Sequence, residues 1–177
     1  MKTTQILFAG FGGQGVLFAG KFLAYKGLVQ DKQVSWLPSY GPEMRGGTAN
    51  CSVIISDTPV GSPIITNPDM LVAMNLPSLQ KFVGCVVPGG HIFVDSTLIT
   101  AKVDRTDVQV HYIPATQMAR DAGFSTLANM ILTGKVLKET DGIRFEGNKE
   151  TLERFIPAKK ANLIDINCKA LQAGYDY

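Results

Sequence analysis

The sequence predicts an α/β fold: a Rossmann-like, doubly wound and mostly parallel sheet with helices on both faces. Short apolar segments alternate along the chain with segments of helical periodicity, which is typical of this class. The first apolar segment, residues 6–9, runs directly into a cluster of glycines, as a buried parallel strand does before a tight turn. The chain has 177 residues, of which 45% are hydrophobic and 18% charged, and we expect residues 1–177 to form a single domain.

Each predicted element rests on a local pattern. After the strand at 6–9, apolar side chains recur at helical spacing over 14–26, and Gly27 gives a stop. A strand at 33–37 would close a first βαβ unit, and the β-branched alternation over 48–56 predicts the next strand. The remaining strands are predicted at 69–75, 91–95 and 108–113, and the remaining helices at 77–82, 115–122, 127–137 and from 149 to about 173 with a break at Pro157.

Charge and hydropathy exclude several classes of partner. Seventeen Lys and Arg residues against 15 Asp and Glu residues give a net charge of +2, so we expect no nucleic-acid partner. No apolar run approaches the roughly 20 residues of a membrane span. The N-terminal residues pass straight into a strand without the apolar region and cleavage site of a signal peptide, so we expect a cytoplasmic protein.

The cysteines and histidines predict neither a metal site nor a catalytic group. Cys51, Cys85 and Cys168 are far apart and form no C-x-x-C pair, and we expect buried, reduced thiols. His91 and His111 are expected near the beginnings of strands, half-exposed and without a catalytic partner. We therefore expect no catalytic residue and no metal ligand in this chain.

A glycine-rich segment joins the first predicted strand to the first predicted helix. It consists of Gly10, Phe11, Gly12, Gly13, Gln14 and Gly15. Glycines spaced G-x-G-x-x-G permit a tight turn, a close approach of backbone to phosphate, and close packing of helix on strand. The helix N-terminus adds free N–H groups and a partial positive charge. We expect a phosphate-binding turn; a turn that only packs tightly, with no nucleotide, is the alternative.

A nicotinamide dinucleotide fits this turn poorly. Such a site places an acid after the second strand to bind ribose hydroxyls. The residues there are Trp36, Leu37, Pro38 and Ser39, none of them acidic. Asp31 precedes that strand, and Glu43 lies far into the next loop.

A second motif follows the strand predicted at 33–37. It consists of Ser39, Tyr40, Gly41, Pro42, Glu43, Met44, Arg45, Gly46 and Gly47. Its glycines and proline shape the backbone, and Arg45 is suited to binding an anion. In a parallel sheet this loop would lie at the same carboxyl edge as the glycine-rich turn. A solvated loop without a ligand is the alternative.

Together the two motifs resemble the gamma subunits of 2-oxoacid:ferredoxin (acceptor) oxidoreductases, with the 2-oxoglutarate and 2-ketoisovalerate types most similar. The resemblance rests on segments 10–16 and 39–48 and extends through 51–54, 68–69, Asn75, 88–90 and the helix containing Asn129. It covers most of the chain.

This resemblance implies a multi-subunit enzyme that oxidatively decarboxylates a 2-oxoacid, expected to be 2-oxoglutarate, to acyl-CoA and CO₂ and passes electrons to ferredoxin. It implies thiamine diphosphate and Mg²⁺ between alpha and beta subunits, and 4Fe–4S clusters on beta and a ferredoxin-like delta component. This chain would be a non-catalytic component that supports assembly and the coenzyme A side of the site.

Two roles for the motifs follow from the resemblance. The first places a phosphate of coenzyme A on Gly10, Gly12, Gly13, Gln14, Gly15 and Arg45. The second makes a partner-facing or active-site-facing loop of Ser39, Tyr40, Gly41, Pro42, Glu43, Met44, Gly46 and Gly47. An autonomous dinucleotide-binding Rossmann protein and a purely structural subunit without a ligand are the alternatives.

Overall fold

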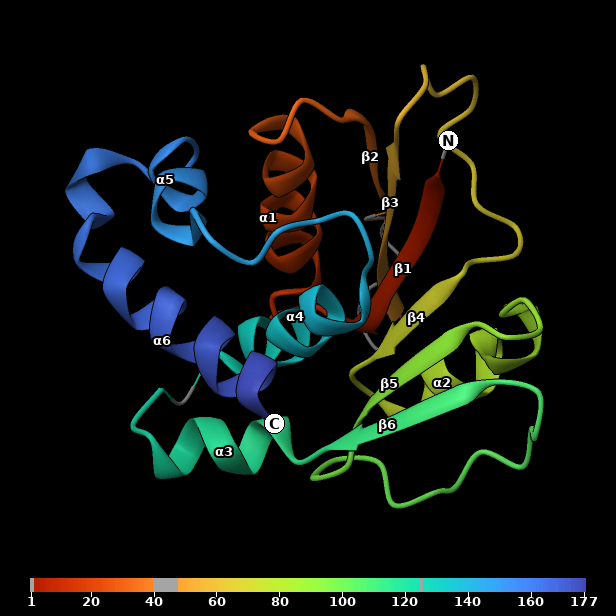
Figure 1. Cartoon of the computed structure of the whole chain (residues 1–177). Helices are drawn as coiled ribbons and strands as arrows, with labels where there is room; N and C mark the ends of the chain where they lie inside the picture. The colour runs from red at the N-terminus through yellow and green to blue at the C-terminus, as the bar shows by residue number, and fades with distance from the viewer. Residues whose placement is uncertain (1, 40–47, 125) are drawn as a thin grey trace.

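The computed structural model describes residues 2–39, 48–124 and 126–177. Six strands within these ranges form one sheet in the order β2-β3-β1-β4-β5-β6 (Figure 1). The strands are β1 (Thr3–Phe11), β2 (Gln33–Ser39), β3 (Thr48–Ser56), β4 (Met70–Ala73), β5 (His91–Asp95) and β6 (Gln109–Ile113). The helices are α1 (Val16–Leu28), α2 (Leu76–Phe82), α3 (Ala115–Asp121), α4 (Ala128–Glu139), α5 (Asn148–Glu153) and α6 (Asn162–Asp176), with 3₁₀ turns η2 (Val83–Cys85) and η3 (Ala158–Lys160).

The predicted mostly parallel sheet is confirmed, with one reversed strand among those described. β1, β4, β5 and β6 pair in parallel. β3 pairs antiparallel with both β1 and β2, so β2 runs in the same direction as β1. The prediction of a simple βαβ unit from β1, α1 and β2 was wrong in one respect, because β3 lies between its two strands.

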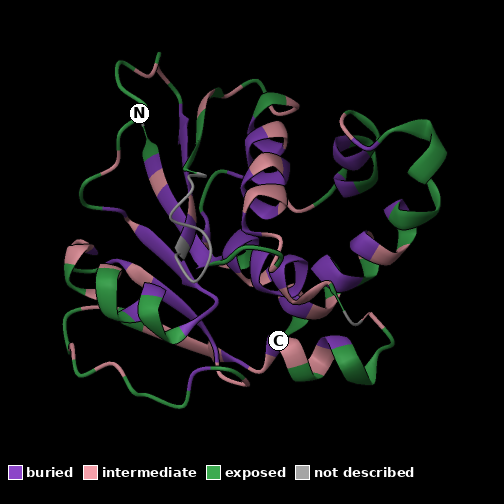
Figure 2. Ribbon diagram, turned by 180° about the vertical axis from the view of Figure 1, so that it is seen from behind, coloured by how far each residue is buried: buried purple, intermediate pink, exposed green. Residues whose placement is uncertain are grey.

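Helices cover both faces of the sheet, as predicted. Along β1, Ile6 and Phe8 join the core under α1, α4 and α6, whereas Leu7 joins a smaller core with Leu79 of α2 on the opposite face. This alternation is the period of two that a strand buried on both faces requires. Figure 2 shows buried residues through the central strands and exposed residues along the outer faces of the helices.

Glycines allow close packing at three of the helices, α1, α4 and α6. A β-carbon on Gly20 of α1 would collide with the Sγ atom of Cys51 on β3. A β-carbon on Gly134 of α4 would collide with the carbonyl oxygen of Leu171 on α6, and one on Gly174 with that of Ile131. These glycines let α1 lie directly on the sheet and let α4 and α6 cross in contact. Within the described residues, no helix is both long and apolar enough to cross a membrane.

Candidate functional site

The glycine-rich turn leaves the carboxyl end of β1 and enters α1, as the sequence predicted. β1 ends at Phe11, and Gly15 occupies the N-cap position of α1. Gly13 and Gly15 have left-handed backbones with φ of 88° and 77°. Only glycine adopts this conformation at little cost, so these two residues are required by the path of the turn.

Gln14 holds the turn in shape from within. The Phe11 N–H donates to Gln14 Oε1 at 2.6 Å, and Gln14 Nε2 donates to the Met74 carbonyl at 2.9 Å. Gln14 therefore connects the turn to the end of β4. A β-carbon on Gly10 would lie 2.7 Å from Gln14 Oε1 and 3.0 Å from the β-carbon of Met74, so Gly10 provides the room for this connection.

Asn129 of α4 supports the turn from the core side. Its Nδ2 donates to the Gly15 carbonyl at 3.0 Å, across 114 residues of sequence. Asn129 is only 3% exposed, and its Oδ1 has no hydrogen-bond partner among the described residues. A β-carbon on Gly15 would collide with the Asn129 amide. The resemblance includes the helix of Asn129, but no local pattern predicts this contact.

The N-terminus of α1 opens into a groove of about 230 Å³. The groove is lined by Phe11, Gly12, Gly13, Gly15, Val16, Leu17, Phe18 and Ala49. Among the described residues no side chain caps the helix, and its first turn contains no acidic residue, so the N–H groups of that turn and the positive end of the helix dipole are suited to an anion. The groove combines an apolar lining with a site for one negative group.

The second predicted motif is described only at its first residue. Ser39 ends β2 and pairs with Asn50 of β3, which in turn pairs with Ala9 of β1. Ser39 thus lies at the carboxyl edge that carries the glycine-rich turn. Tyr40, Gly41, Pro42, Glu43, Met44, Arg45, Gly46 and Gly47 lie outside the described residues.

The sheet topology weakens the nicotinamide interpretation further. Asp31 precedes β2 at the opposite, amino edge of the sheet, where it cannot contact a ribose bound at the turn. β3 also separates β2 from β1, which places β2 roughly 10 Å from β1 at the usual strand spacing. Asp95, at the end of β5, accepts hydrogen bonds from the Thr97 N–H and from the N–H and hydroxyl of Thr116, so it serves the local fold.

Several large apolar side chains are exposed on or near the same carboxyl edge. Phe11 is the last residue of β1, Leu76 follows β4 and Leu98 follows β5, and they are 41%, 38% and 45% exposed. Trp36 and Leu37, at 37% and 41%, add to this set from the edge strand β2. Exposed apolar residues gathered in this way are typical of a protein–protein contact surface.

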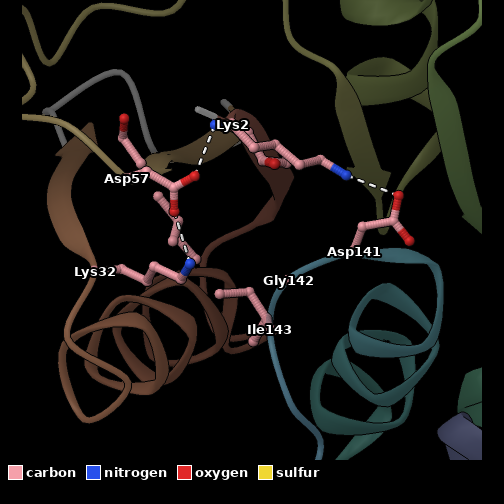
Figure 3. Close-up of a pocket in the computed structure, with 9 residues that line it drawn as sticks. Lys2, Lys32, Asp57, Asp141, Gly142 and Ile143 are labelled. Atoms are coloured by element: carbon pink, nitrogen blue, oxygen red, sulfur yellow. Dashed lines mark hydrogen bonds and ion pairs between the residues drawn. The ribbon is translucent and has the colours of Figure 1, made fainter.

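The charged side chains that line a smaller pocket at the amino edge pair with one another. It measures about 70 Å³ and lies between Lys2, Lys32, Asp57 and Asp141 (Figure 3). Asp57 accepts from Lys32 Nζ at 2.7 Å and from the Lys2 backbone N–H at 2.8 Å, and Lys2 Nζ pairs with Asp141 at 2.8 Å. The Lys32 hydrogen bond, followed by that of Lys2, holds the pKa of Asp57 below its usual range. These charges satisfy one another, so the pocket is a poor ligand site.

The cysteines and histidines differ in part from expectation. Cys51 is buried as predicted, but Cys85 and Cys168 are half-buried; all three are free thiols. His91 begins β5 as expected, whereas His111 is the third residue of β6.

The sequence matches the family described as pyruvate ferredoxin/flavodoxin oxidoreductase over residues 5–177. It is 41% identical over 174 residues to the ketoisovalerate oxidoreductase subunit VorA of Methanothermobacter thermautotrophicus, covering 98% of this chain and 36% of VorA. It is 34% identical over 176 residues to the 2-oxoglutarate synthase subunit KorC of Methanocaldococcus jannaschii, covering 97% of this chain and 92% of KorC. The chain thus spans little more than a third of the VorA relatives but most of KorC.

Solved structures agree with this match. The gamma subunit of keto/oxoacid ferredoxin oxidoreductase from Geobacter sulfurreducens is 30% identical, with a TM-score of 0.80 over 98% of this chain and 96% of that one. A 2-oxoglutarate:ferredoxin oxidoreductase from Magnetococcus marinus, with 2-oxoglutarate, coenzyme A and succinyl-CoA bound, gives a TM-score of 0.87 at 23% identity over 99% of this chain and 31% of that one, and so shares the fold. The chain belongs to the pyruvate ferredoxin/flavodoxin oxidoreductase family, and over nearly its whole length it corresponds to the gamma subunits of 2-oxoacid:ferredoxin oxidoreductases.

Proposed function

We propose that the chain acts as the gamma component of an enzyme that oxidatively decarboxylates a 2-oxoacid to acyl-CoA and CO₂ with ferredoxin as electron acceptor, and that its 10–15 turn binds a phosphate of coenzyme A. The observation that carries the proposal is the groove over the N-terminus of α1, which no side chain of the described residues caps. A helix N-terminus without a cap or an acid binds phosphate through its N–H groups and dipole.

Coenzyme A suits the groove better than an inorganic anion. It carries phosphate groups on a molecule that is otherwise long and largely uncharged. A phosphate would meet the first turn of α1, while the apolar side chains of Phe11, Leu17 and Phe18 would contact the adjoining uncharged part. Arg45 is the proposed second phosphate ligand, because its guanidinium binds phosphate bidentately.

Docking onto alpha and beta subunits is the second part of the proposal. The exposed apolar residues at the carboxyl edge, Leu76 and Leu98 among them, support a partner surface beside the groove. Coenzyme A would then lie at a subunit boundary.

We assign no catalytic residue to this chain. The groove is lined by glycine and apolar side chains, which cannot transfer protons. Burial raises the pKa of the Cys51 thiol to about 12, so it stays protonated and is a poor iron–sulfur ligand. Thiamine diphosphate, Mg²⁺ and the 4Fe–4S clusters are therefore proposed to be held by the alpha, beta and delta partners, where they supply the carbon–carbon cleavage and electron transfer.

The proposed substrate is 2-oxoglutarate, and 2-ketoisovalerate is the second candidate. KorC, the 2-oxoglutarate synthase subunit, matches this chain over 92% of its own length. VorA, a ketoisovalerate oxidoreductase subunit, is more similar at 41% identity, which favours the branched-chain alternative.

The test is reconstitution of the chain with its alpha and beta subunits, followed by viologen reduction with each 2-oxoacid. We expect activity that requires both coenzyme A and the 2-oxoacid, and the preferred 2-oxoacid identifies the substrate. Arg45→Ala should raise the coenzyme A KM without changing the 2-oxoacid KM. Activity that does not need coenzyme A would contradict the proposal.

Docking has its own test. A double Leu76→Ser and Leu98→Ser variant should lose alpha and beta subunits in a pull-down. Leu28→Ser is the matched control, because Leu28 is 52% exposed but ends α1 at the amino edge. A Tyr40→Ala and Arg45→Ala double variant tests the 39–47 loop in the same assay. Wild-type retention of partners by both double variants would refute the docking surface.

Thermal shift separates the remaining alternatives. Coenzyme A bound to the folded chain should raise its apparent stability, by an amount that grows with the logarithm of the ligand concentration once that concentration exceeds Kd. Strong stabilisation by NAD(H) would instead favour an autonomous dinucleotide-binding protein. A response to none of NAD(H), FAD and coenzyme A, in the chain or in the complex, would favour a purely structural subunit.

A further inference from the structure

His91, His111 and Glu139 come together on the sheet face covered by α4, away from the glycine-rich turn. His91 begins β5, His111 lies in β6, and Glu139 is the last residue of α4. His91 Nδ1 and His111 Nε2 are 3.0 Å apart, and one ligand atom from each of the three side chains lies within 4.8 Å of the others. The sequence predicted no metal site, because His91 and His111 were expected only as half-exposed residues near the beginnings of strands.

The two imidazoles are held in place by their surroundings. Their rings are parallel within 2°, with centroids 5.3 Å apart, and Phe93 stacks on His111 at 4.7 Å. Phe93 and His111 are directly paired residues of β5 and β6. The imidazoles therefore sit on a rigid ladder and need little ordering to bind a ligand together.

Glu139 supplies the negative charge of the cluster. Its carboxylate pairs with Lys135 Nζ at 2.9 Å through one oxygen, and its side chain is 25% exposed. A carboxylate has two oxygens, so one can bind a cation while the other keeps the lysine.

We propose that His91, His111 and Glu139 form a binding site for a divalent first-row transition metal ion, with Zn²⁺ as the ion of choice. Two nitrogens and one carboxylate oxygen are a ligand set that Zn²⁺ uses, with a fourth position left to water. Tetrahedral bonds of about 2.0–2.1 Å place two nitrogens roughly 3.3 Å apart, close to the separation found here. The ligand atom of Glu139 lies within 4.8 Å of both nitrogens, so its side chain would have to rotate toward the ion to bind it.

The neighbouring residues complete the site. His91 and Glu139 line a cavity of about 270 Å³ that also includes Asp69 and the ion pair of Lys2 with Asp141, so the fourth position faces space for water. Gln109 Nε2 lies 3.5 Å from His91 Nε2. When His91 binds the metal through Nδ1, its Nε2–H can donate to the Gln109 amide oxygen after an amide flip, as outer-shell partners of metal-bound histidines do.

The metal would cross-link the edge of the sheet to the end of α4. It would connect the end of α4 to β5 and β6, which already pair with each other as parallel strands. A ligand that binds only the folded chain raises stability by mass action. Zn²⁺ is therefore expected to raise the Tm of the protein.

The experiment uses the full chain without a histidine tag, stripped of metal, at neutral pH. The chain has two histidines in all, so histidine-dependent binding can come only from this pair. Titration calorimetry with ZnCl₂ should show one ion per chain, and His91→Asn and Glu139→Gln should each weaken binding at least about tenfold. Asp141→Asn, a neighbouring acid outside the ligand set, should leave the stoichiometry unchanged.

Two further measurements make the result decisive. Co²⁺ should give the visible absorption of a tetrahedral site without a thiolate charge-transfer band, which excludes Cys85 and Cys168 as the ligands. Circular dichroism of the metal-free variants shows that they fold. No saturable Zn²⁺ binding, or binding that both variants retain, would overturn the proposal and leave His91 and His111 as a hydrogen-bonded pair.

Discussion

Asn129 and Gln14 keep the shape of the glycine-rich turn through hydrogen bonds to backbone. Asn129→Ala removes the bond to the Gly15 carbonyl, which then keeps only its hydrogen bond from the Ala19 N–H. We expect a loss of about 1–2 kcal/mol in the free energy of unfolding. Urea denaturation measures it, with Asn162→Ala, at an exposed position in α6, as the control that should stay within about 0.5 kcal/mol. Equal stability of the two variants would contradict this role.

Lys26 carries a buried charge whose cost depends on pH. It is 0% exposed and donates from Nζ to the carbonyls of Phe145 and Glu146. Burial lowers its pKa from 10.5 to about 8, although the nearby Glu146 acts in the opposite direction. Because the unfolded chain binds the proton more tightly, the cost of the charge is full below pH 8 and disappears as the pH rises to about 10.5.

The wild type should therefore gain stability relative to Lys26→Met over that pH window, by up to about 3 kcal/mol. The other lysines titrate in both proteins, so their contribution to the pH dependence cancels in the difference between the wild type and Lys26→Met. Urea denaturation of both proteins at several pH values between about 7 and 10.5 checks it. Parallel stability curves would show that Lys26 keeps an ordinary pKa.

At the scale of elements, the crossing of α4 and α6 depends on two glycines. A β-carbon at Gly134 or Gly174 would collide with a carbonyl oxygen of the facing helix, and backbone cannot move aside as a side chain can. We expect Gly134→Ala and Gly174→Ala each to lower the free energy of unfolding by about 1–3 kcal/mol, despite alanine's better helix propensity. Gly84→Ala, with open space at its β-carbon, is the matched control. A stabilising effect at Gly134 would contradict the close crossing.

Local patterns predicted the elements well and their assembly less well. β3 and β5 were predicted with their observed bounds, because β-branched and apolar runs between turn residues are local signals. The insertion of β3 between β1 and β2 was not predicted, since strand pairing joins residues far apart along the chain.

For the candidate site, too, local sequence predicted the backbone turn but not the contacts between distant residues. The 10–15 turn was predicted because its glycines encode the backbone path, and Gly13 and Gly15 are left-handed as such a turn requires. The contact of Asn129 with Gly15 and the meeting of His91 with His111 depend on tertiary packing, which no local spacing reveals. Binding by Arg45 and the 39–47 loop stays a prediction.

At the scale of the whole molecule, we propose that residues 1–177 form one folding unit. One sheet runs through the described residues, and helices from both halves of the chain pack on it (Figure 1). Calorimetry should give a single transition whose van't Hoff and calorimetric enthalpies agree. Two separable transitions would show that the chain contains two units.

The two edges of the sheet carry different features. Its carboxyl edge carries the glycine-rich turn, the α1 groove and the exposed apolar residues, whereas its amino edge carries the paired charges around Asp57. This arrangement predicts that coenzyme A and the partner subunits meet the chain at one edge. Substitutions at the amino edge should therefore leave the coenzyme A KM unchanged.

The coenzyme A KM of a reconstituted Leu17→Glu enzyme, compared with Leu17→Gln, tests the central claim most directly. Leu17 lines the groove in the first turn of α1, and the two variants differ only in charge. Glutamate suits a helix N-terminus, so it should not destabilise the fold more than glutamine. We predict a coenzyme A KM at least about tenfold higher for the glutamate variant, with the 2-oxoacid KM unchanged, because its carboxylate repels the bound phosphate. Equal coenzyme A KM values in the two variants would contradict a phosphate at this turn.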